Sequence, residues 1–284
     1  MPKHFRAYST GLIVILAMSS FFASAQLKTD KGPSLKAQAD TLMAHEDYAG
    51  ALVLYDKIIQ ATKFKAPEDY AVFYNRAYCK YGLAQYADAL KDVNQYLDKV
   101  PDEQARLLRL YINQELGDTA AQLEDLDIFM AANPASTQLL RWRASVLMQA
   151  DRYAAAKKDI RQLLVYEPGP EVKSYLGLCY FYEDDLDSAL VIFDEVIASD
   201  PAFIQTYLYA GSLCLDEDQY DAALFYIDKG LKQEPTNRTL IFYKGIALVE
   251  KKNTTEGCRW LTKAFEAGED DAAAYLKQYC YGDN

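Results

Sequence analysis

The chain has 284 residues, of which 41 are acidic and 30 are basic, so its formal net charge is −11. Nucleic acids and anionic lipid headgroups are bound through basic patches, so this acidity speaks against both, and we expect no nucleic-acid partner. The 23 tyrosines and the aromatic share of 13% exclude a disordered acidic tail and predict a packed protein.

Residues 1–25 have the pattern of a cleavable export signal. Lys3 and Arg6 precede an apolar run at residues 11–18, and small residues follow it. The run is shorter than the roughly 20 residues that a membrane span needs, so we prefer a signal peptide to an anchor. No cysteine lies close after the run, which disfavours a lipid-anchored protein. We expect cleavage before Gln26, and we expect that the cleaved protein does not insert into a membrane. We further expect a bacterial protein that is periplasmic, associated with the outer membrane, or secreted.

The rest of the chain is punctuated by prolines at intervals of 33 or 34 residues. They are Pro101, Pro134, Pro168, Pro201 and Pro235. A fixed period of this length is typical of a stacked helical-repeat array. Each proline follows a stretch that we expect to be helical, where it can end a helix without lying inside it.

Small residues recur with the same period and predict two helices in each unit. One series is Ala51, Ala89, Ala156, Ala189, Ala223 and Gly257; the other, twelve residues earlier, is Ala39, Ala77, Ala144, Gly177, Gly211 and Gly245. Two helices approach closely only where side chains are small, so these paired positions predict a helix–helix contact in every unit. Polar turns between the two positions join the helices.

These positions carry a family resemblance. Leu176, Gly177 and Tyr180, followed by Ala189, Phe193 and Pro201, resemble the signature of a tetratricopeptide repeat, and the pattern returns between Tyr207 and Pro235. The resemblance implies an all-α, right-handed superhelical solenoid of antiparallel helix pairs, which binds a peptide or a partner helix in a concave groove lined by the first helices.

We predict a single solenoid over residues 26–284, with seven repeats and a final helix. The repeats are approximately 31–67, 68–102, 103–136, 137–169, 170–203, 204–237 and 238–268, and the capping helix is 269–281. The third repeat is the weakest, because Leu110 and Gln122 replace its two small residues. In the capping helix, Ala274, Leu276 and Tyr279 are the residues that we expect to pack on the last repeat.

Catalytic and metal-binding patterns are absent from the sequence. After signal cleavage only His45 remains of the two histidines, which excludes a zinc site with several histidines and disfavours a Ser-His-Asp arrangement. The acidic turns around 183–187 and 216–221 lack the glycine and the distant glutamate of a calcium loop, so we interpret them as solvated turns. No glycine loop for phosphates is present. We predict no enzyme activity, no metal and no cofactor.

The five cysteines fall into two groups. Cys79, Cys179 and Cys214 lie on predicted first helices, where buried, unreactive thiols are expected. Cys258 begins the last second helix and Cys280 ends the capping helix, so antiparallel packing would bring them together. Because disulfides persist in exported proteins, we hypothesise a bridge between Cys258 and Cys280, with two free thiols as the alternative.

The resemblance assigns candidate partner-binding residues to the first helices. They are Lys36, Tyr74, Tyr78, Tyr81, Tyr111, Arg141, Ser145, Ser174, Phe181, Tyr182, Gln205 and Ser212. Tyrosine buries a large area at low entropic cost and keeps a polar tip, which suits recognition. The alternative for each ring is a place in the core between repeats.

We therefore expect an exported scaffold that binds a protein or peptide partner in its groove in the bacterial cell envelope. The alternative is a structural subunit of a periplasmic or outer-membrane complex, held through its convex face or its ends. A carbohydrate-binding or hydrolytic helical protein is a third possibility, which would need carboxylates converging in one cleft.

Overall fold

The structure, a computed structural model, describes residues 34–281; the predicted export signal lies outside these residues and stays a prediction. The α-helices are α1 (Leu35–Ala44), α2 (Tyr48–Ala61), α3 (Ala71–Gly82), α4 (Tyr86–Leu97), α5 (Glu103–Leu116), α6 (Thr119–Ala132), α7 (Thr137–Gln149), α8 (Tyr153–Tyr166), α9 (Pro170–Phe181), α10 (Leu186–Ser199), α11 (Ile204–Asp216), α12 (Tyr220–Gln233), α13 (Arg238–Glu250), α14 (Thr254–Glu266) and α15 (Ala272–Tyr279). A short 3-10 helix, η1 (Pro67–Tyr70), lies in the longer connection between α2 and α3.

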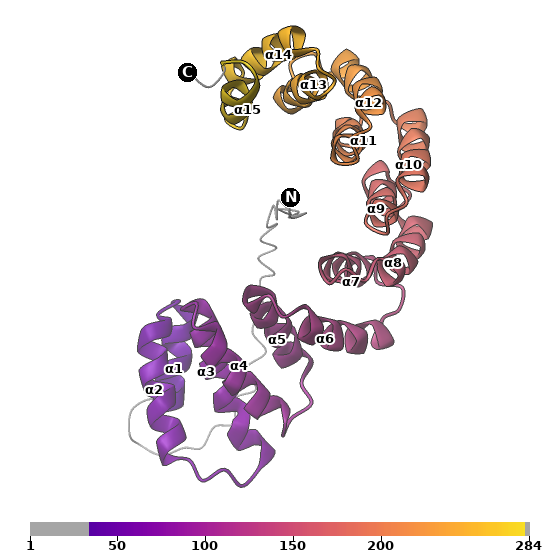
Figure 1. The fold of residues 1–284 in the computed structure, drawn as a ribbon. Coiled ribbons are helices and arrows are strands. Elements are labelled where there is room, and N and C mark those ends of the chain that lie inside the picture. Colours follow the sequence, from indigo (N-terminus) through magenta and orange to yellow (C-terminus); the bar gives the residue numbers. More distant parts are fainter. Residues whose placement is uncertain (1–33, 282–284) are drawn as a thin grey trace.

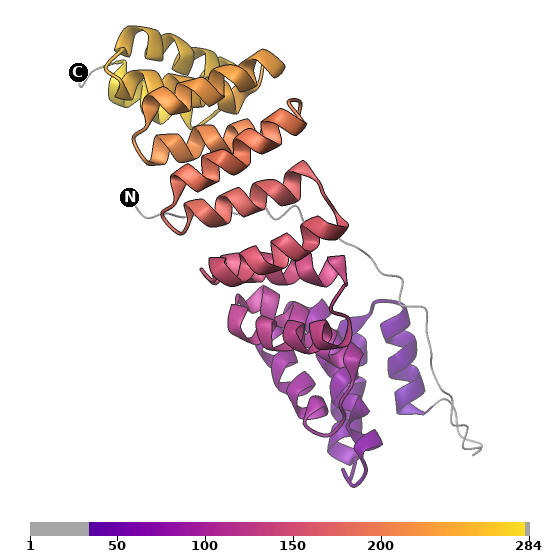
Figure 2. The same cartoon turned by 90° about the vertical axis from the view of Figure 1, so that its right-hand side faces the viewer.

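Consecutive helices pack as antiparallel pairs, and the pairs stack into a curved array (Figures 1 and 2). In Figure 1, α5, α7, α9, α11 and α13 follow the inner side of the arc, and α6, α8, α10, α12 and α14 follow its outer side. We call these the inner and outer helices; α1 and α3 are the equivalents of inner helices in the first two pairs. Among the described residues there is no β-strand, and the predicted all-α solenoid is confirmed.

Small residues lie where the two helices of a pair meet. Ala51, Ala89, Ala156, Ala189 and Ala223 on the outer helices are completely buried. On α9, a Cβ atom added to Gly177 would lie 2.6 Å from the Phe193 ring of α10, so the pair has no room for a side chain there. The repeating small residues thus allow each pair its close approach.

Every turn from a first to a second helix contains a residue in the left-handed backbone region. These residues are Glu46, Ala84, Gly117, Asp151, Asp184, Asp218 and Lys252, with φ between 55° and 72°. A left-handed residue after a helix allows the chain to reverse and satisfies carbonyl groups of the last turn. Only one of the seven is glycine, so most repeats accept some backbone strain here.

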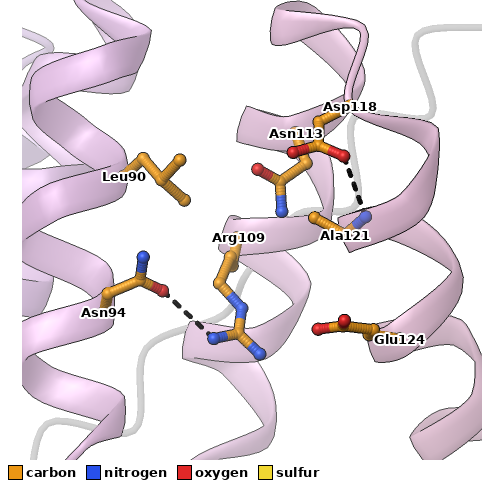
Figure 3. Close-up of a pocket in the computed structure, with 7 residues that line it drawn as sticks. All are labelled: Leu90, Asn94, Arg109, Asn113, Asp118, Ala121 and Glu124. Carbon is orange, nitrogen blue, oxygen red and sulfur yellow. Dashed lines mark hydrogen bonds between the residues drawn. The ribbon is translucent and has the colours of Figure 1, made fainter.

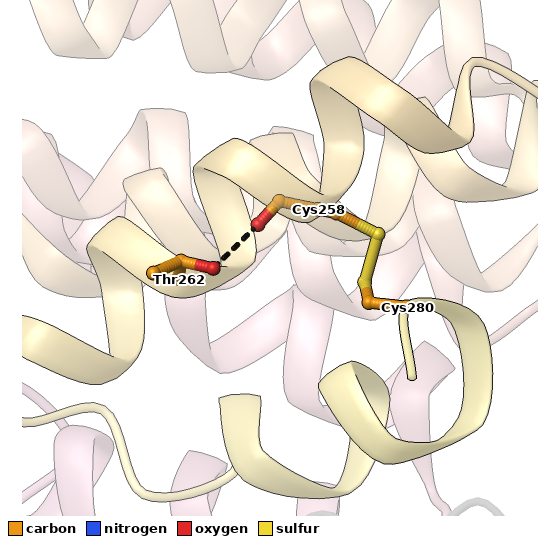
Figure 4. The surroundings of a disulfide bond; sticks show 3 residues. All are labelled: Cys258, Thr262 and Cys280. Atoms are coloured by element: carbon orange, nitrogen blue, oxygen red, sulfur yellow. Dashed lines mark hydrogen bonds between the residues drawn. A yellow bond between two sulfur atoms is a disulfide. The ribbon is translucent and has the colours of Figure 1, made fainter. Parts of the chain in front are cut away.

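Helix α15 covers the end of the array and is tied to it covalently. Cys258 of α14 and Cys280 form a disulfide, with their Cα atoms 5.7 Å apart (Figure 4). Ala272 and Leu276 of α15 are buried in the last apolar cluster. Ala274 is exposed, so the expectation that it packs on the last repeat is wrong.

Candidate partner-binding surface

Ten of the twelve residues assigned from the resemblance are exposed or half-buried. They are Lys36, Tyr74, Tyr78, Tyr81, Tyr111, Arg141, Ser145, Tyr182, Gln205 and Ser212. They lie on α1, α3, α5, α7 and α11, with Tyr182 at the C-terminal end of α9. All therefore belong to the helices on the inner side of the arc or to their equivalents.

Two of the twelve residues are buried, contrary to their assignment to an open groove. Ser174 is 0% exposed; its hydroxyl donates to the Pro170 carbonyl at 2.8 Å and lies 3.1 Å from the hydroxyl of Thr206 on the next inner helix. Phe181 is 4% exposed and packs edge-on against Tyr182. Ser174 thus contacts the next repeat, and Phe181 belongs to a buried apolar cluster with residues of α10 to α13, so neither side chain is open to a partner.

A row of half-buried rings on the inner helices was missed by the sequence reasoning. It consists of Trp142, Tyr175, Tyr209 and Tyr243, one on each of α7, α9, α11 and α13. Each ring lies two residues before the small residue of its helix, about 160° around the helix from the contact with the outer helix. The rings recur every 33 or 34 residues, so the repeat period itself could have revealed them. We call these four residues the inner ring row.

Ring contacts extend this row toward both ends of the array. The Trp142 ring lies 5.3 Å from that of Tyr111 on α5. At the other end, Tyr275 of α15 packs edge-on against Phe242 of α13, with ring centroids 5.3 Å apart. Aromatic pairs in such geometries add stabilisation beyond the area that they bury. Trp142 at one end of the row therefore contacts Tyr111, and the Tyr243 ring at the other end lies 6.2 Å from that of Phe242, which contacts Tyr275.

Three tyrosines of the inner helices, Tyr74, Tyr175 and Tyr182, have raised pKa values. Burial, followed by the charge of Asp102, raises the pKa of Tyr74 to about 12. Burial, followed by the charge of Asp216, raises the pKa of Tyr182 to about 12. Burial and the Glu171 carboxylate likewise raise the pKa of Tyr175. These hydroxyls are neutral hydrogen-bond donors and acceptors under physiological conditions.

The predicted basic residues on this side of the arc are already paired. Lys36 donates to Asp40 one turn along α1, at 2.6 Å. Arg141 donates to Glu167 at 2.5 Å, and its second terminal nitrogen lies 3.6 Å from Glu171. Hydrogen bonds from Thr137 and then Arg141 lower the pKa of Glu167. Neither cation is therefore an isolated positive charge offered to an acidic partner.

Carboxylates occupy one position of the inner helices repeatedly. Glu115, Asp216 and Glu250 each lie five residues after the small position of their helix, or after Leu110 in the third repeat. Asp216 is close enough to raise the pKa of both Tyr182 and Tyr275. The inner side therefore combines aromatic rings with negative charge, which lies at the C-terminal ends of the individual helices α5, α11 and α13.

An arginine ladder joins the first four pairs through their interior. For each arginine, two guanidinium nitrogens donate to a buried aspartate on the outer helix of the same pair, at 2.6–2.8 Å. A third guanidinium nitrogen donates to a residue on the outer helix of the preceding pair. The three sets are Arg76 with Asp92 and Asp56, Arg109 with Asp125 and Asn94, and Arg143 with Asp159 and Asp127. This two-pronged geometry is strong and specific to arginine. The ladder is structural and was also missed by the sequence reasoning.

Candidate metal-binding groups and membrane-spanning helices are both absent from residues 34–281. No group of three or more histidine, cysteine or acidic side chains is arranged there to hold a metal ion. His45 is exposed at the end of α1, with Nδ1 2.8 Å from the Thr41 carbonyl oxygen. Of the described helices, none is long and apolar enough to cross a membrane.

The comparisons with known proteins agree with this architecture. The tetratricopeptide repeat family model matches residues 36–103 and 142–202. The C-terminal part of a TPR repeat-containing protein from Cytophaga hutchinsonii is 18% identical, with a TM-score of 0.57 over 84% of this chain and 98% of that one. A tetratricopeptide repeat protein from Parabacteroides merdae is also 18% identical, with a TM-score of 0.53 over 86% and 96% of the two chains. No curated protein matches the sequence.

Proposed function

This chain is a tetratricopeptide repeat protein, and we propose that it binds a segment of another protein along its inner side. The tetratricopeptide repeat fold generally serves as a scaffold for protein–protein interaction. The inner ring row is the observation that carries this proposal. Its four rings follow the arc from α7 to α13, each half-buried and each in the same helical position. Rigid rings with a polar tip are the residues that contribute most at protein interfaces.

The charge distribution favours a basic or neutral partner. Glu115, Asp216 and Glu250 accompany the rings, whereas Arg141 is paired with two glutamates. A basic segment would gain from this potential during encounter, and an acidic one would be repelled. The expected partner segment is therefore apolar or aromatic, with lysine or arginine toward the end that faces α11 and α13.

The exposed apolar side chains bear on the alternative of a structural subunit held through its convex face or its ends. Val53, Ile128, Val165, Val191 and Phe225 are each at least 46% exposed, but they lie on five different outer helices. An end-on interface would instead need one contiguous apolar patch at a terminus. Phe265 and Tyr281 are exposed near the C-terminal end, but neither these two residues nor the rings of the outer helices recur at one position of four successive repeats, so we prefer the inner side.

Export to the bacterial cell envelope is part of the proposal. It is supported by the signal pattern of residues 1–25 and by the disulfide between Cys258 and Cys280, since such bonds persist in oxidising compartments. Export is tested by expressing the full chain, including residues 1–25, in bacteria and measuring the mass of the periplasmic product. A mature chain that begins at Gln26 is expected, and an uncleaved cytoplasmic product would contradict it.

A double substitution in the inner ring row tests the binding site. Tyr175→Leu with Tyr209→Leu keeps apolar volume but removes two rings and their hydroxyls. We expect the amount of partner captured from envelope extracts to fall at least tenfold, which corresponds to about 1.4 kcal/mol. Tyr166→Leu on α8, where the ring is 50% exposed on an outer helix, is the control. Equal capture by both variants would argue against the inner side.

A further inference from the structure

A second concave site lies away from the inner ring row, between the second and third pairs. It is a cavity of about 230 Å³, open to solvent on one side and bordered by α4, α5, the start of α6 and the turn before it (Figure 3). Leu90 and Asn94 come from α4, Arg109 and Asn113 from α5, and Asp118, Ala121 and Glu124 from the start of α6. It lies in the third repeat, where large residues replace the small ones.

A buried amide oxygen without a partner in the described part of the chain belongs to Asn113, which lines this cavity. Asn113 is 1% exposed, and its Oδ1 is a buried side-chain atom with no hydrogen-bond partner among residues 34–281. In Figure 3 its amide lies between Leu90 and Asp118. An unsatisfied buried acceptor is unfavourable, so a group that donates a hydrogen bond is favoured here.

The charged groups around the cavity favour a cation as that donor. Glu124 is exposed at its rim, and Asp118 has one carboxylate oxygen engaged in capping α6, at 3.0 Å from the Ala121 nitrogen. The one basic side chain that lines the cavity, Arg109, is held by both oxygens of Asp125 and by Asn94. Its charge is thus largely compensated by Asp125, with a further electrostatic interaction from Glu124, so the surroundings of the cavity are acidic overall.

The chain itself fills the equivalent space two repeats later with a lysine. At the junction of α8, α9 and α10, Lys157 occupies the position of Leu90, Tyr180 that of Asn113, and Asp185 that of Asp118. The Lys157 side chain is only 13% exposed; its Nζ lies 4.3 Å from the centre of the Tyr180 ring and forms an ion pair with Glu183. A lysine ammonium is therefore compatible with this space in the repeat geometry.

We propose that the cavity between α4, α5 and α6 is a binding site for a lysine side chain of a partner protein. The aliphatic stem lies along Leu90, and the ammonium group donates to Asn113 Oδ1 and to the carboxylates of Asp118 and Glu124. The site takes one side chain, in contrast to the extended segment proposed for the inner side, and the two sites are independent.

A blocked Gly-Lys-Gly peptide is the probe for this site, and the same peptide with norleucine in place of lysine is its control. We expect the lysine peptide to shift the NMR signals of the Asn113 side-chain amide and the Ala121 backbone amide at millimolar concentrations, which are typical of a single side chain. The norleucine peptide should leave both signals unchanged. Equal shifts with both peptides, or no shift with either because the cavity holds only water, would overturn the proposal.

Two variants separate the site from its surroundings. The Leu90→Lys variant supplies the ammonium group from the chain itself, as Lys157 does in the later repeat. In this variant the NMR signal of the Asn113 side-chain amide should differ from that of the wild type before any peptide is added, and the lysine peptide should not shift it further. Glu124→Gln removes an exposed carboxylate without disturbing packing and should weaken the peptide about tenfold. Glu266→Gln, at an exposed acidic position on α14, is the matched control and should bind as the wild type does. A Glu124→Gln variant that binds as tightly as this control would contradict the assignment.

Discussion

The third and the seventh helix pairs solve the same packing problem in opposite ways. In the seventh pair, Gly245 and Gly257 face each other, and a Cβ atom on Gly257 would lie 2.8 Å from the backbone nitrogen of Val249. In the third pair, Leu110 and Gln122 stand at the two positions, and both are buried. The helices of the seventh pair are in backbone contact, whereas those of the third pair are separated by the Leu110 and Gln122 side chains.

The difference has consequences for polar groups. In the third pair, Gln122 donates from its amide to the carbonyl oxygens of Asn113 and Asp118, both at 3.4 Å, and the Asn113 side chain keeps an unpaired oxygen beside a cavity. The seventh pair is instead closed by apolar contacts and by the disulfide to α15. A repeat that departs from the small-residue pattern thus retains space and unsatisfied polarity that a regular repeat excludes.

The largest expected effect on stability comes from removing the disulfide between Cys258 and Cys280, which ties α15 to the seventh pair. Replacing Cys258 and Cys280 by serine removes a cross-link across 22 residues, which is worth about 3 kcal/mol in the chain-entropy model. Hydrogen exchange should show faster opening of α13 to α15 and little change in α5 and α6, because each repeat contacts only its neighbours.

The thiol count checks that this bond forms. Denatured, unreduced protein should contain three reactive thiols, from Cys79, Cys179 and Cys214, which are free and buried in the native fold. Five reactive thiols would show that the cross-link is absent.

Gly257→Ala should destabilise the seventh pair by about 2 kcal/mol, because the added methyl group would press on backbone that cannot move freely. Chemical denaturation followed by circular dichroism measures the change. Gly169→Ala is the control, since a Cβ atom there would have no neighbour within 4 Å. Equal stability of the two variants would mean that α13 and α14 are further apart in solution than in this structure.

Asn113→Leu should stabilise the third pair by about 1 kcal/mol, because it removes an unsatisfied buried acceptor and fills space. Leucine already occupies the same position in the fourth and seventh pairs, as Leu147 and Leu248. The melting temperature of this variant should therefore rise. A fall would indicate that the amide has a partner, such as a bound water.

Exchanging residues in the turns should have the smallest effect. Gly117→Ala places a side chain at φ +72° and should cost about 1 kcal/mol, whereas Ala84→Gly at φ +57° should gain up to about 1 kcal/mol. Opposite signs in thermal denaturation are expected. Two changes of the same sign would mean that these turns do not share one backbone geometry.

The fold was predictable because one physical constraint recurs in every repeat. Helices that cross closely need small residues, and Gly257, 34 residues after Ala223, continued the period where the closing proline is missing. The arginine ladder was equally predictable in principle. Arg76, Arg109 and Arg143 recur at the repeat period, sixteen residues before their aspartates.

The candidate site was less predictable because exposure depends on neighbours as well as on helical position. Ser174 and Tyr74 occupy equivalent positions on α9 and α3, yet Ser174 is buried and Tyr74 is half-buried. The short serine lets Thr206 of the next repeat approach to 3.1 Å. The cavity beside Asn113 depends in the same way on how far apart three helices stand, which no single sequence position determines.

The arginine ladder also implies uneven mechanical stiffness. Arg76, Arg109 and Arg143 each join the buried aspartate of their own pair to a residue of the preceding outer helix, namely Asp56, Asn94 and Asp127. Bending the array there would stretch these bridging hydrogen bonds. At the equivalent positions of the fifth and sixth pairs stand Leu176 and Ala210, whose contacts are apolar and without direction. We therefore expect the array to act as a spring with a stiff N-terminal part and a softer segment at α9 to α12. Curvature there can change to match the length of whatever lies within the arc.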